Sequence, residues 1–164
     1  MGGTIRNGGT FAVECFGLAR MFSLTNELVC MFDEITKNLP ALFAALFLAV
    51  LFIQSGLDKV FDWKGNLEWL TGHFSKTFLA GMVPMMLGTI TLLELATGIL
   101  AAAGFVKCLL TGITTYIFYA GVLAALSLTS LFFGQRLAKD YAGAAVLVPY
   151  FLLALATMYL TLPK

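Results

Sequence analysis

The sequence predicts an all-α integral membrane protein that folds as a four-helix bundle. Hydrophobic residues make up 60% of the 164 residues and charged residues only 12%, whereas soluble domains have about 45–50% and about 25%. The mean hydropathy is +0.91. The charged residues also fall in clumps that are separated by four long apolar gaps. A helix needs about 20 apolar residues to cross the roughly 30 Å hydrocarbon layer, so each gap can hold one span.

The four gaps set the predicted spans. They run from Lys37 to Asp58 with 20 enclosed residues, from Lys76 to Lys107 with 30, from Lys107 to Arg136 with 28, and from Asp140 to Lys164 with 23. We predict spans over residues 39–57, 82–103, 109–133 and 142–162. Their uninterrupted apolar runs favour helices over a barrel, whose strands alternate in hydrophobicity. The segment AGFVK, residues 103–107, predicts a tight hairpin that makes the second and third spans antiparallel neighbours.

The connection between the first two spans, residues 62–81, has its own helical pattern. Its apolar residues recur at helical spacing at Trp63, Leu67, Leu70, Phe74 and Phe78. Aromatic and lysine side chains of this kind are typical of the headgroup boundary. We predict an interfacial helix that is broken near Gly72. Two roles stay open for it, a lid packed over the end of the bundle and a gate for a ligand.

The remaining sequence divides the chain into two parts. Residues 1–34 form an amino-terminal extension that we expect to be poorly ordered, and Met31 is an alternative start just before the first span. Residues 35–164 form the four-span domain. An even number of spans places both termini on the same side of the membrane. Each side carries five Lys and Arg residues, so the positive-inside rule does not choose an orientation.

Composition argues against several classes of function. The net charge is +1 with no basic cluster, so the chain has no electrostatic footprint for nucleic acid. Cys15, Cys30 and Cys108 form neither a C-x-x-C pair nor a metal-binding spacing. The only histidine, His73, lies outside the spans, where it cannot supply the axial pair of a haem. We therefore expect the chain itself to hold no metal and no redox cofactor.

An acidic residue within the second span is the most informative feature. In TLLELATGILAAAG, residues 91–104, Glu94 shares a helix face with Thr91, Thr97 and Gly98. Small and polar faces on membrane helices point towards other helices. A charge at the bilayer centre costs about 2.5–3.5 kcal/mol on insertion scales, and no Lys or Arg lies within any predicted span. We therefore expect Glu94 to be protonated, or to be hydrogen-bonded to hydroxyls and amides on neighbouring helices.

Other polar residues could join Glu94 in a site. The candidate buried or proton-handling residues are Glu94, Gln54, Asp58 and Lys59, and the candidate rim residues are Arg136, Lys139 and Asp140. The long side chain of Lys59 or Arg136 could reach inward and shorten its distance to Glu94. The alternative is that these charges only flank the helices at the membrane interface. For the Ser and Thr residues of the spans, the simpler interpretation is that their hydroxyls bond their own backbone.

Three segments resemble a known family. They are LFLAVLFIQSGLDKVFDW, TLLELATGILAAAG and LSLTSLFFGQRLAKDYAGAAVLVPYFLLALATMYL. Over about residues 35–163 the chain resembles the DoxX family of small four-span bacterial and archaeal membrane proteins. The order of motifs is the one expected in that family, G-x-x-K followed by an acid-x-x-x-Gly. Here these motifs are Gly56 with Lys59, and Glu94 with Gly98.

The resemblance implies a subunit or anchor in the cytoplasmic (inner) cell membrane, within or beside a redox assembly. Relatives include thiosulfate:quinone oxidoreductase subunits and partners of soluble antioxidant and sulfur-transfer enzymes. We therefore expect other membrane or soluble redox subunits as partners, and a quinone or a partner as the electron carrier. A second hypothesis is a small-solute or proton-coupled transporter, or a channel-like homo-oligomer, although the matched broken spans of inverted-repeat transporters are missing. A third is a structural assembly factor, which predicts that Glu94→Leu is tolerated.

Overall fold

The computed structural model describes residues 26–27, 29, 32–75, 77 and 79–163. The chain divides into two compact units, Met1–Lys37 and Asn38–Lys164. Most of the predicted extension, residues 1–34, lies outside the described residues, as do Cys15, Cys30, Met31 and Phe78. The part of the first unit that is described is helical, and an exposed pair joins Lys37 Nζ to Glu34 Oε1 at 3.4 Å.

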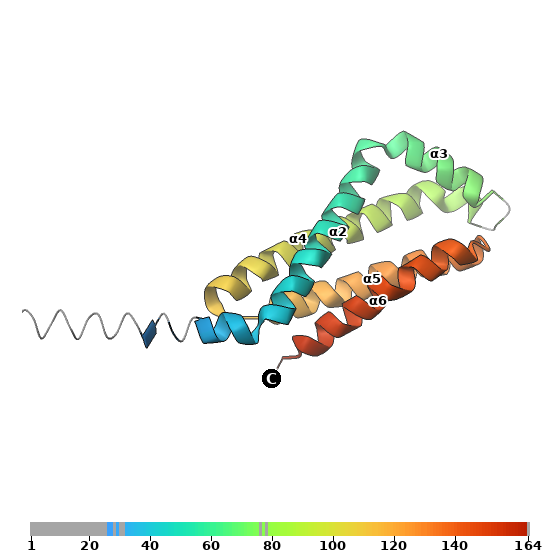
Figure 1. Cartoon of the computed structure of the whole chain (residues 1–164). Helices are drawn as coiled ribbons and strands as arrows, with labels where there is room; N and C mark the ends of the chain where they lie inside the picture. Colours follow the sequence, from blue (N-terminus) through green and yellow to red (C-terminus); the bar gives the residue numbers. More distant parts are fainter. Residues whose placement is uncertain (1–25, 28, 30–31, 76, 78, 164) are drawn as a thin grey trace, which may run out of the picture. The chain divides into compact units, whose positions relative to one another are not determined.

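The second unit is built from helices. They are α2 (Leu39–Phe61), α3 (Trp63–His73), the short 3₁₀ helix η1 (Ala80–Met82), α4 (Val83–Thr111), α5 (Thr115–Leu137) and α6 (Tyr141–Leu160). The four longest, α2, α4, α5 and α6, are each long and apolar enough to cross a membrane. They pack along one another in the order α2, α4, α5, α6 (Figure 1). The predicted all-α four-helix membrane bundle is therefore confirmed.

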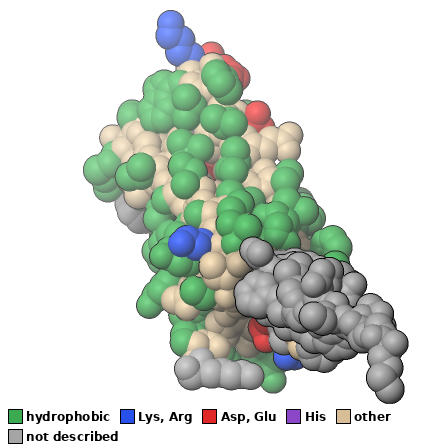
Figure 2. All heavy atoms as spheres, turned by 90° about the vertical axis from the view of Figure 1, so that its left-hand side faces the viewer, with side chains coloured by type: hydrophobic (Ala, Val, Ile, Leu, Met, Phe, Trp, Pro, Cys, Tyr) green, Lys and Arg blue, Asp and Glu red, His purple; other side chains and the backbone are tan. Residues whose placement is uncertain are grey.

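The surface of these helices suits a hydrocarbon environment. Among the described residues visible in Figure 2, hydrophobic side chains are spread over the whole face and charged side chains are few. On α4, for example, Leu92, Ile99 and Leu110 point outwards and are exposed. In water such a surface would drive aggregation, whereas in a bilayer it faces acyl chains of the same polarity. The four helices and this apolar exterior identify a multi-pass membrane protein.

Small residues allow the spans to approach closely. The core cluster combines Leu48 and Phe52 of α2 with Ala101 of α4, Ala120 and Ala124 of α5, and Ala154 of α6. A Cβ atom added at Gly98 of α4 would lie 2.7 Å from the backbone nitrogen of Ile53 in α2. Packing between membrane helices depends on van der Waals contact, so residues without bulk let the backbones meet.

The end of α4 corrects the predicted hairpin at residues 103–107. The helix continues through this segment to Thr111, and it ends where Gly112 adopts a left-handed conformation with φ of 71°. Gly104 serves a different purpose, because an added Cβ there would lie 2.9 Å from the backbone nitrogen of Ile117 in α5. Lys107 is exposed and does not interrupt the helix. The turn therefore comes about eight residues later than predicted, at the glycine that caps the helix.

The connection after α2 contains the predicted additional helix. The side chain of Asp62 accepts a hydrogen bond from the backbone N–H of Gly65 at 3.2 Å and caps the start of α3. The helix ends at His73, one residue beyond the glycine where a break was predicted. Phe74, Leu79 and Val83 follow it and form a small second core with partly buried Leu67 and Leu70. This core holds the connection against the start of α4.

Candidate functional site

A buried polar cluster joins α2 to α4. Glu94 projects from α4 with only 1% of its side chain exposed, and Lys59 reaches it from the last turn of α2 with 18% exposed. Lys59 Nζ lies 2.8 Å from Glu94 Oε2 and donates a hydrogen bond to Glu94 Oε1 at 3.1 Å. Ser55, one turn before Lys59 on α2, donates its hydroxyl to Oε1 at 3.2 Å. The carboxyl group is therefore enclosed by two side chains of a single neighbouring helix.

The ammonium group of Lys59 is well satisfied within this cluster. Besides contacting Glu94, Nζ donates to the Ser55 hydroxyl at 2.9 Å and to the Ser55 carbonyl oxygen at 3.2 Å. The contact with Glu94 Oε2 is the shorter of the two carboxylate contacts, but it is an ion pair without hydrogen-bond alignment. A charged pair away from water is tolerated only when such additional hydrogen bonds satisfy its remaining groups.

The partner of Glu94 corrects part of the sequence interpretation. Glu94 was predicted to be protonated, or hydrogen-bonded to hydroxyls and amides on neighbouring helices, because no basic residue lies within the predicted spans. The hydrogen bond from the Ser55 hydroxyl of α2 agrees with the second alternative, and the ion pair with Lys59 is the correction. The structure extends α2 to Phe61, four residues past the predicted end, so Lys59 belongs to the helix. Of the two side chains that could reach inward, Lys59 and Arg136, that of Lys59 does so and contacts Glu94. Ser55 was not predicted, although it precedes Lys59 by one helical turn.

The other two candidates on α2 do not join the cluster. Gln54 and Asp58 are exposed, and together with Val50, Leu57 and Phe61 they border a shallow hollow on another side of the helix. Successive residues of an α-helix are rotated by about 100°, so positions 54 and 58 lie on a different side of α2 from positions 55 and 59. The predicted grouping of Gln54 and Asp58 with Glu94 is therefore wrong in its geometry.

The candidate rim residues have local partners. The guanidinium carbon of Arg136 lies 4.7 Å above the ring of Tyr141. Asp140 caps α6 by accepting a hydrogen bond from the backbone N–H of Gly143 at 2.9 Å. Lys139 lies in the turn between α5 and α6 with a φ of 60°. Among the described residues, the ion pair of Glu94 is with Lys59 and not with these rim charges.

Most hydroxyls in the spans bond their own backbone, as predicted. Thr91, Thr97 and Thr157 each donate to the carbonyl oxygen four residues earlier, at 2.7–2.8 Å. Ser127 differs, because its buried hydroxyl oxygen has no hydrogen-bond partner among the described residues. Ser55 also differs, because its hydroxyl donates to a carboxylate on another helix. The interhelical hydroxyl contact of this site is thus made by Ser55.

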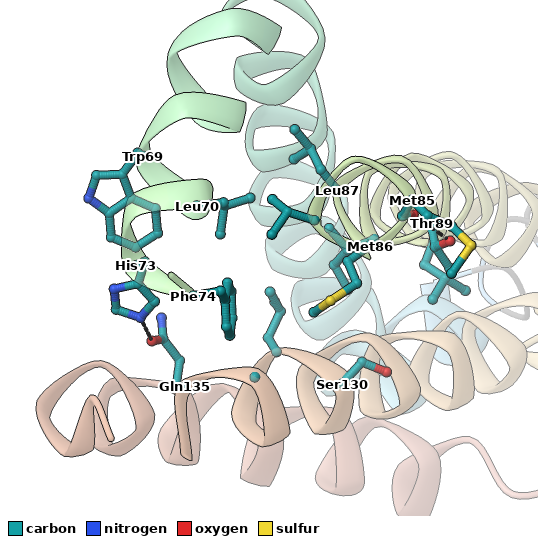
Figure 3. A pocket seen from close by; sticks show the side chains of 15 residues that line it. Trp69, Leu70, His73, Phe74, Met85, Met86, Leu87, Thr89, Ser130 and Gln135 are labelled. Atoms are coloured by element: carbon teal, nitrogen blue, oxygen red, sulfur yellow. Dashed lines mark hydrogen bonds between the residues drawn. The ribbon is translucent and has the colours of Figure 1, made fainter. Parts of the chain in front are cut away.

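A separate cavity of about 340 Å³ lies between α3, α4 and α5. Its walls are largely apolar, with Leu70 and Phe74 near α3 and Leu87 on α4 (Figure 3). At one side of it, Nε2 of His73 lies 3.2 Å from Oε1 of Gln135 on α5, and Trp69 stacks on the His73 ring with centroids 4.6 Å apart. The sequence did not predict this pocket, because its walls come from three separate segments.

The described residues gather no three His, Cys, Asp or Glu side chains in the way a metal centre requires. No family model, curated protein or solved structure matches this chain. The geometry of the ion-paired cluster and of the apolar pocket is therefore the basis on which a function can be argued.

Proposed function

We propose that this chain is an integral membrane subunit or anchor of a redox-linked assembly, in the manner of the DoxX family that it resembles, and that it is not catalytic alone. The proposal rests on one observation: the two sequence motifs that resemble the DoxX family contact each other in the structure. Gly56 and Lys59 come from α2, and Glu94 and Gly98 come from α4. All four take part in one contact between these helices.

Each motif residue has a physical part in that contact. A Cβ atom added at Gly56 would lie 2.7 Å from Cδ2 of Leu95, so any side chain at this position would force the Leu95 side chain to move. The added Cβ of Gly98 would meet the backbone of Ile53 at a similar distance. The Lys59–Glu94 pair forms beside these close approaches. A buried ion pair adds little stability compared with apolar packing, but it can specify which surfaces meet.

This contact supports an anchor more than a catalyst. Glu94 is 1% exposed and is already paired with Lys59 and Ser55, so its carboxyl group is not presented to a substrate. We assign it the role of fixing α2 on α4. The connection between these two helices contains α3, which has no buried residue and exposes Trp63 and Trp69. In this proposal α3 offers the surface for a partner subunit, and the partner or a quinone carries the electrons.

Purification at native expression level tests the proposal. The tagged chain would be isolated in mild detergent from its own membranes, and co-purifying proteins would be identified by mass spectrometry and by visible absorption of flavin or iron–sulfur groups. We expect a redox partner and quinone-reductase activity in the wild-type sample. We expect Glu94→Gln and Lys59→Leu to release the partner. Lys107→Leu serves as the matched control, because it removes an exposed lysine near the C-terminal end of α4.

Two results would contradict the proposal. The first combines two observations. The chain purifies without any redox-active partner, and deletion of its gene leaves the quinone-reductase activity of the membranes unchanged. The second is movement of protons or a small solute through liposomes that contain this chain alone, with loss of transport in Glu94→Gln. That second result would instead support a transporter.

A further inference from the structure

The cavity between α3, α4 and α5 is suited to a ligand from the membrane. Its lining is mostly apolar and includes Leu70, Phe74, Leu87 and Leu131. At about 340 Å³ its volume lies at the small end of the range of ligand pockets, roughly 300–1,000 Å³. Such a volume holds a ring or a short chain segment. The rest of a larger molecule would remain outside.

Polar side chains lie at both ends of this pocket, but those at one end bond their own helix. Thr89 and Ser130 also border it, but their hydroxyls donate to the carbonyl oxygens of Met85 and Leu126 at 2.9 Å. His73 and Gln135 pair with each other at the other end (Figure 3). With Gln135 Oε1 as the acceptor, Nε2 of His73 carries the proton. The amide N–H groups of Gln135 and Nδ1 of His73 then have no other hydrogen-bond partner among the described residues, so they can serve as a donor and an acceptor.

The charge of the lining decides the class of ligand. No Asp, Glu, Lys or Arg is among the described residues that line the pocket, so an ionised head group would lose its hydration without gaining a counter-ion from them. A neutral head group with a carbonyl or hydroxyl would find both a donor and an acceptor. Met85, on the wall opposite His73, is 61% exposed on the apolar exterior of α4, so a tail can leave there. Methionine side chains adapt easily to such a tail.

We propose that this pocket binds a neutral membrane amphiphile. Its hydrogen-bonding head group lies beside His73 and Gln135, and its apolar tail passes Met85 into the bilayer. In this arrangement α3 covers a binding site. It would then be both a lid packed on the bundle and a gate for a ligand, the two roles that the sequence left open. The inference does not require a redox partner. Two kinds of molecule share the required chemistry, a lipid-soluble quinone and a neutral glycerolipid.

Photolabelling in lipid nanodiscs tests this inference. The probes are a long-chain alcohol and a fatty acid of the same chain length, each with a diazirine in the chain, and the labelled peptides are mapped by mass spectrometry. We expect the alcohol to label the segments that contain Trp69, Met85 and Ser130. We expect the ionised acid to label them about tenfold less, which corresponds to about 1.4 kcal/mol. Equal labelling by the two probes, or labelling elsewhere only, would overturn the inference.

Two variants separate binding from folding. Gly134 borders the cavity, where an added Cβ would lie 3.4 Å from Phe74 Cζ, so Gly134→Leu fills the space. We expect it to reduce labelling about tenfold, while Ala96→Leu, on an exposed position of α4, leaves labelling unchanged. His73→Phe keeps the volume and removes the polar partner, and should abolish the preference for the alcohol. Unchanged labelling in both pocket variants would contradict the inference.

Competition identifies the source of the ligand. An unlabelled short-tailed benzoquinone and an unlabelled monoacylglycerol are added separately before illumination. Displacement of the alcohol probe by either one supports a neutral amphiphile site. Displacement by the monoacylglycerol alone would leave this inference standing even if no redox partner exists, so the two proposals can fail independently. If neither competitor displaces the probe at concentrations that saturate the membrane, the pocket is not such a site.

Discussion

Lys59 of α2 and Glu94 of α4 form an ion pair inside the contact between two membrane-spanning helices, with Nζ 2.8 Å from Oε2. The two partners differ in their access to solvent, because 18% of the Lys59 side chain is exposed but only 1% of that of Glu94. Lys59 also lies two residues from the end of α2, whereas Glu94 lies well within α4. Removal of one partner therefore has a different cost from removal of the other.

We predict that Lys59→Leu destabilises the protein more than Glu94→Leu. The first substitution leaves an enclosed carboxylate without its counter-ion, and loss of one member of a buried pair costs about 3–5 kcal/mol. The second leaves a lysine that can turn towards the interface, so we expect a cost of about 1–2 kcal/mol. Unfolding in detergent micelles, followed by circular dichroism during titration with denaturant, measures both values. A larger cost for Glu94→Leu would contradict the enclosed position of the carboxyl group.

The double substitution Lys59→Leu with Glu94→Leu should recover most of the stability lost in Lys59→Leu. Replacing both members of a buried pair by apolar residues is often neutral, because no unpaired charge remains. The same unfolding titration provides the comparison. Additive losses in the double variant would mean that the two side chains do not interact in the membrane. Recovered stability together with loss of a co-purifying partner would separate the fold from the proposed function.

Substitution of glycine by alanine should distinguish backbone contacts from side-chain contacts. At Gly98 the added Cβ would meet backbone atoms of Ile53, so α2 and α4 must separate, and we expect a loss of about 1–3 kcal/mol. At Gly56 it would meet the end of the Leu95 side chain, which can rotate, and the loss should be smaller. Gly72→Ala is the control, because no described residue lies within 4 Å of its added Cβ. Denaturation midpoints in micelles should therefore rank Gly72→Ala as the most stable of the three.

Ser55→Ala should cost more stability than Ser130→Ala. The Ser55 hydroxyl donates to the Glu94 carboxylate and accepts from Lys59, so its removal leaves both charged groups less well satisfied. Interhelical hydrogen bonds in membranes contribute about 0.6 kcal/mol on average and up to about 1.7 kcal/mol, and we expect a value in the upper part of that range. Among the described residues, the exposed Ser130 hydroxyl bonds only its own helix. Equal unfolding free energies for the two variants would argue against the cluster.

The spans could be predicted from the sequence because the physical signal is strong and local. Long gaps between charged residues follow from the thickness of the hydrocarbon layer, and they located all four helices. The end of α4 was missed for a different reason. Gly104 and Gly112 look alike in the sequence, but the first permits contact with α5 and the second adopts a left-handed turn. Only the packing of the neighbouring helix distinguishes these two uses of glycine.

The candidate site was predicted in part. Glu94 stood out because a carboxyl group in an apolar segment needs a partner, and Lys59 was within reach of it. The choice among Gln54, Ser55 and Asp58 depends on how α2 is rotated about its axis. A helix that is apolar on nearly every side gives little signal for that rotation. The pocket beside His73 was missed because Gln135 lies 62 residues further along the chain.

The unequal lengths of the spans have a consequence for the lipids around them. With 29 residues α4 is about 43 Å long, whereas α6 with 20 residues is about 30 Å long. A bilayer whose core is about 30 Å thick matches α6, so α4 must lean or must extend into the headgroup layer. Any change in acyl chain length alters this mismatch. Membrane thickness thereby acts on the helix that carries Glu94 and one wall of the pocket.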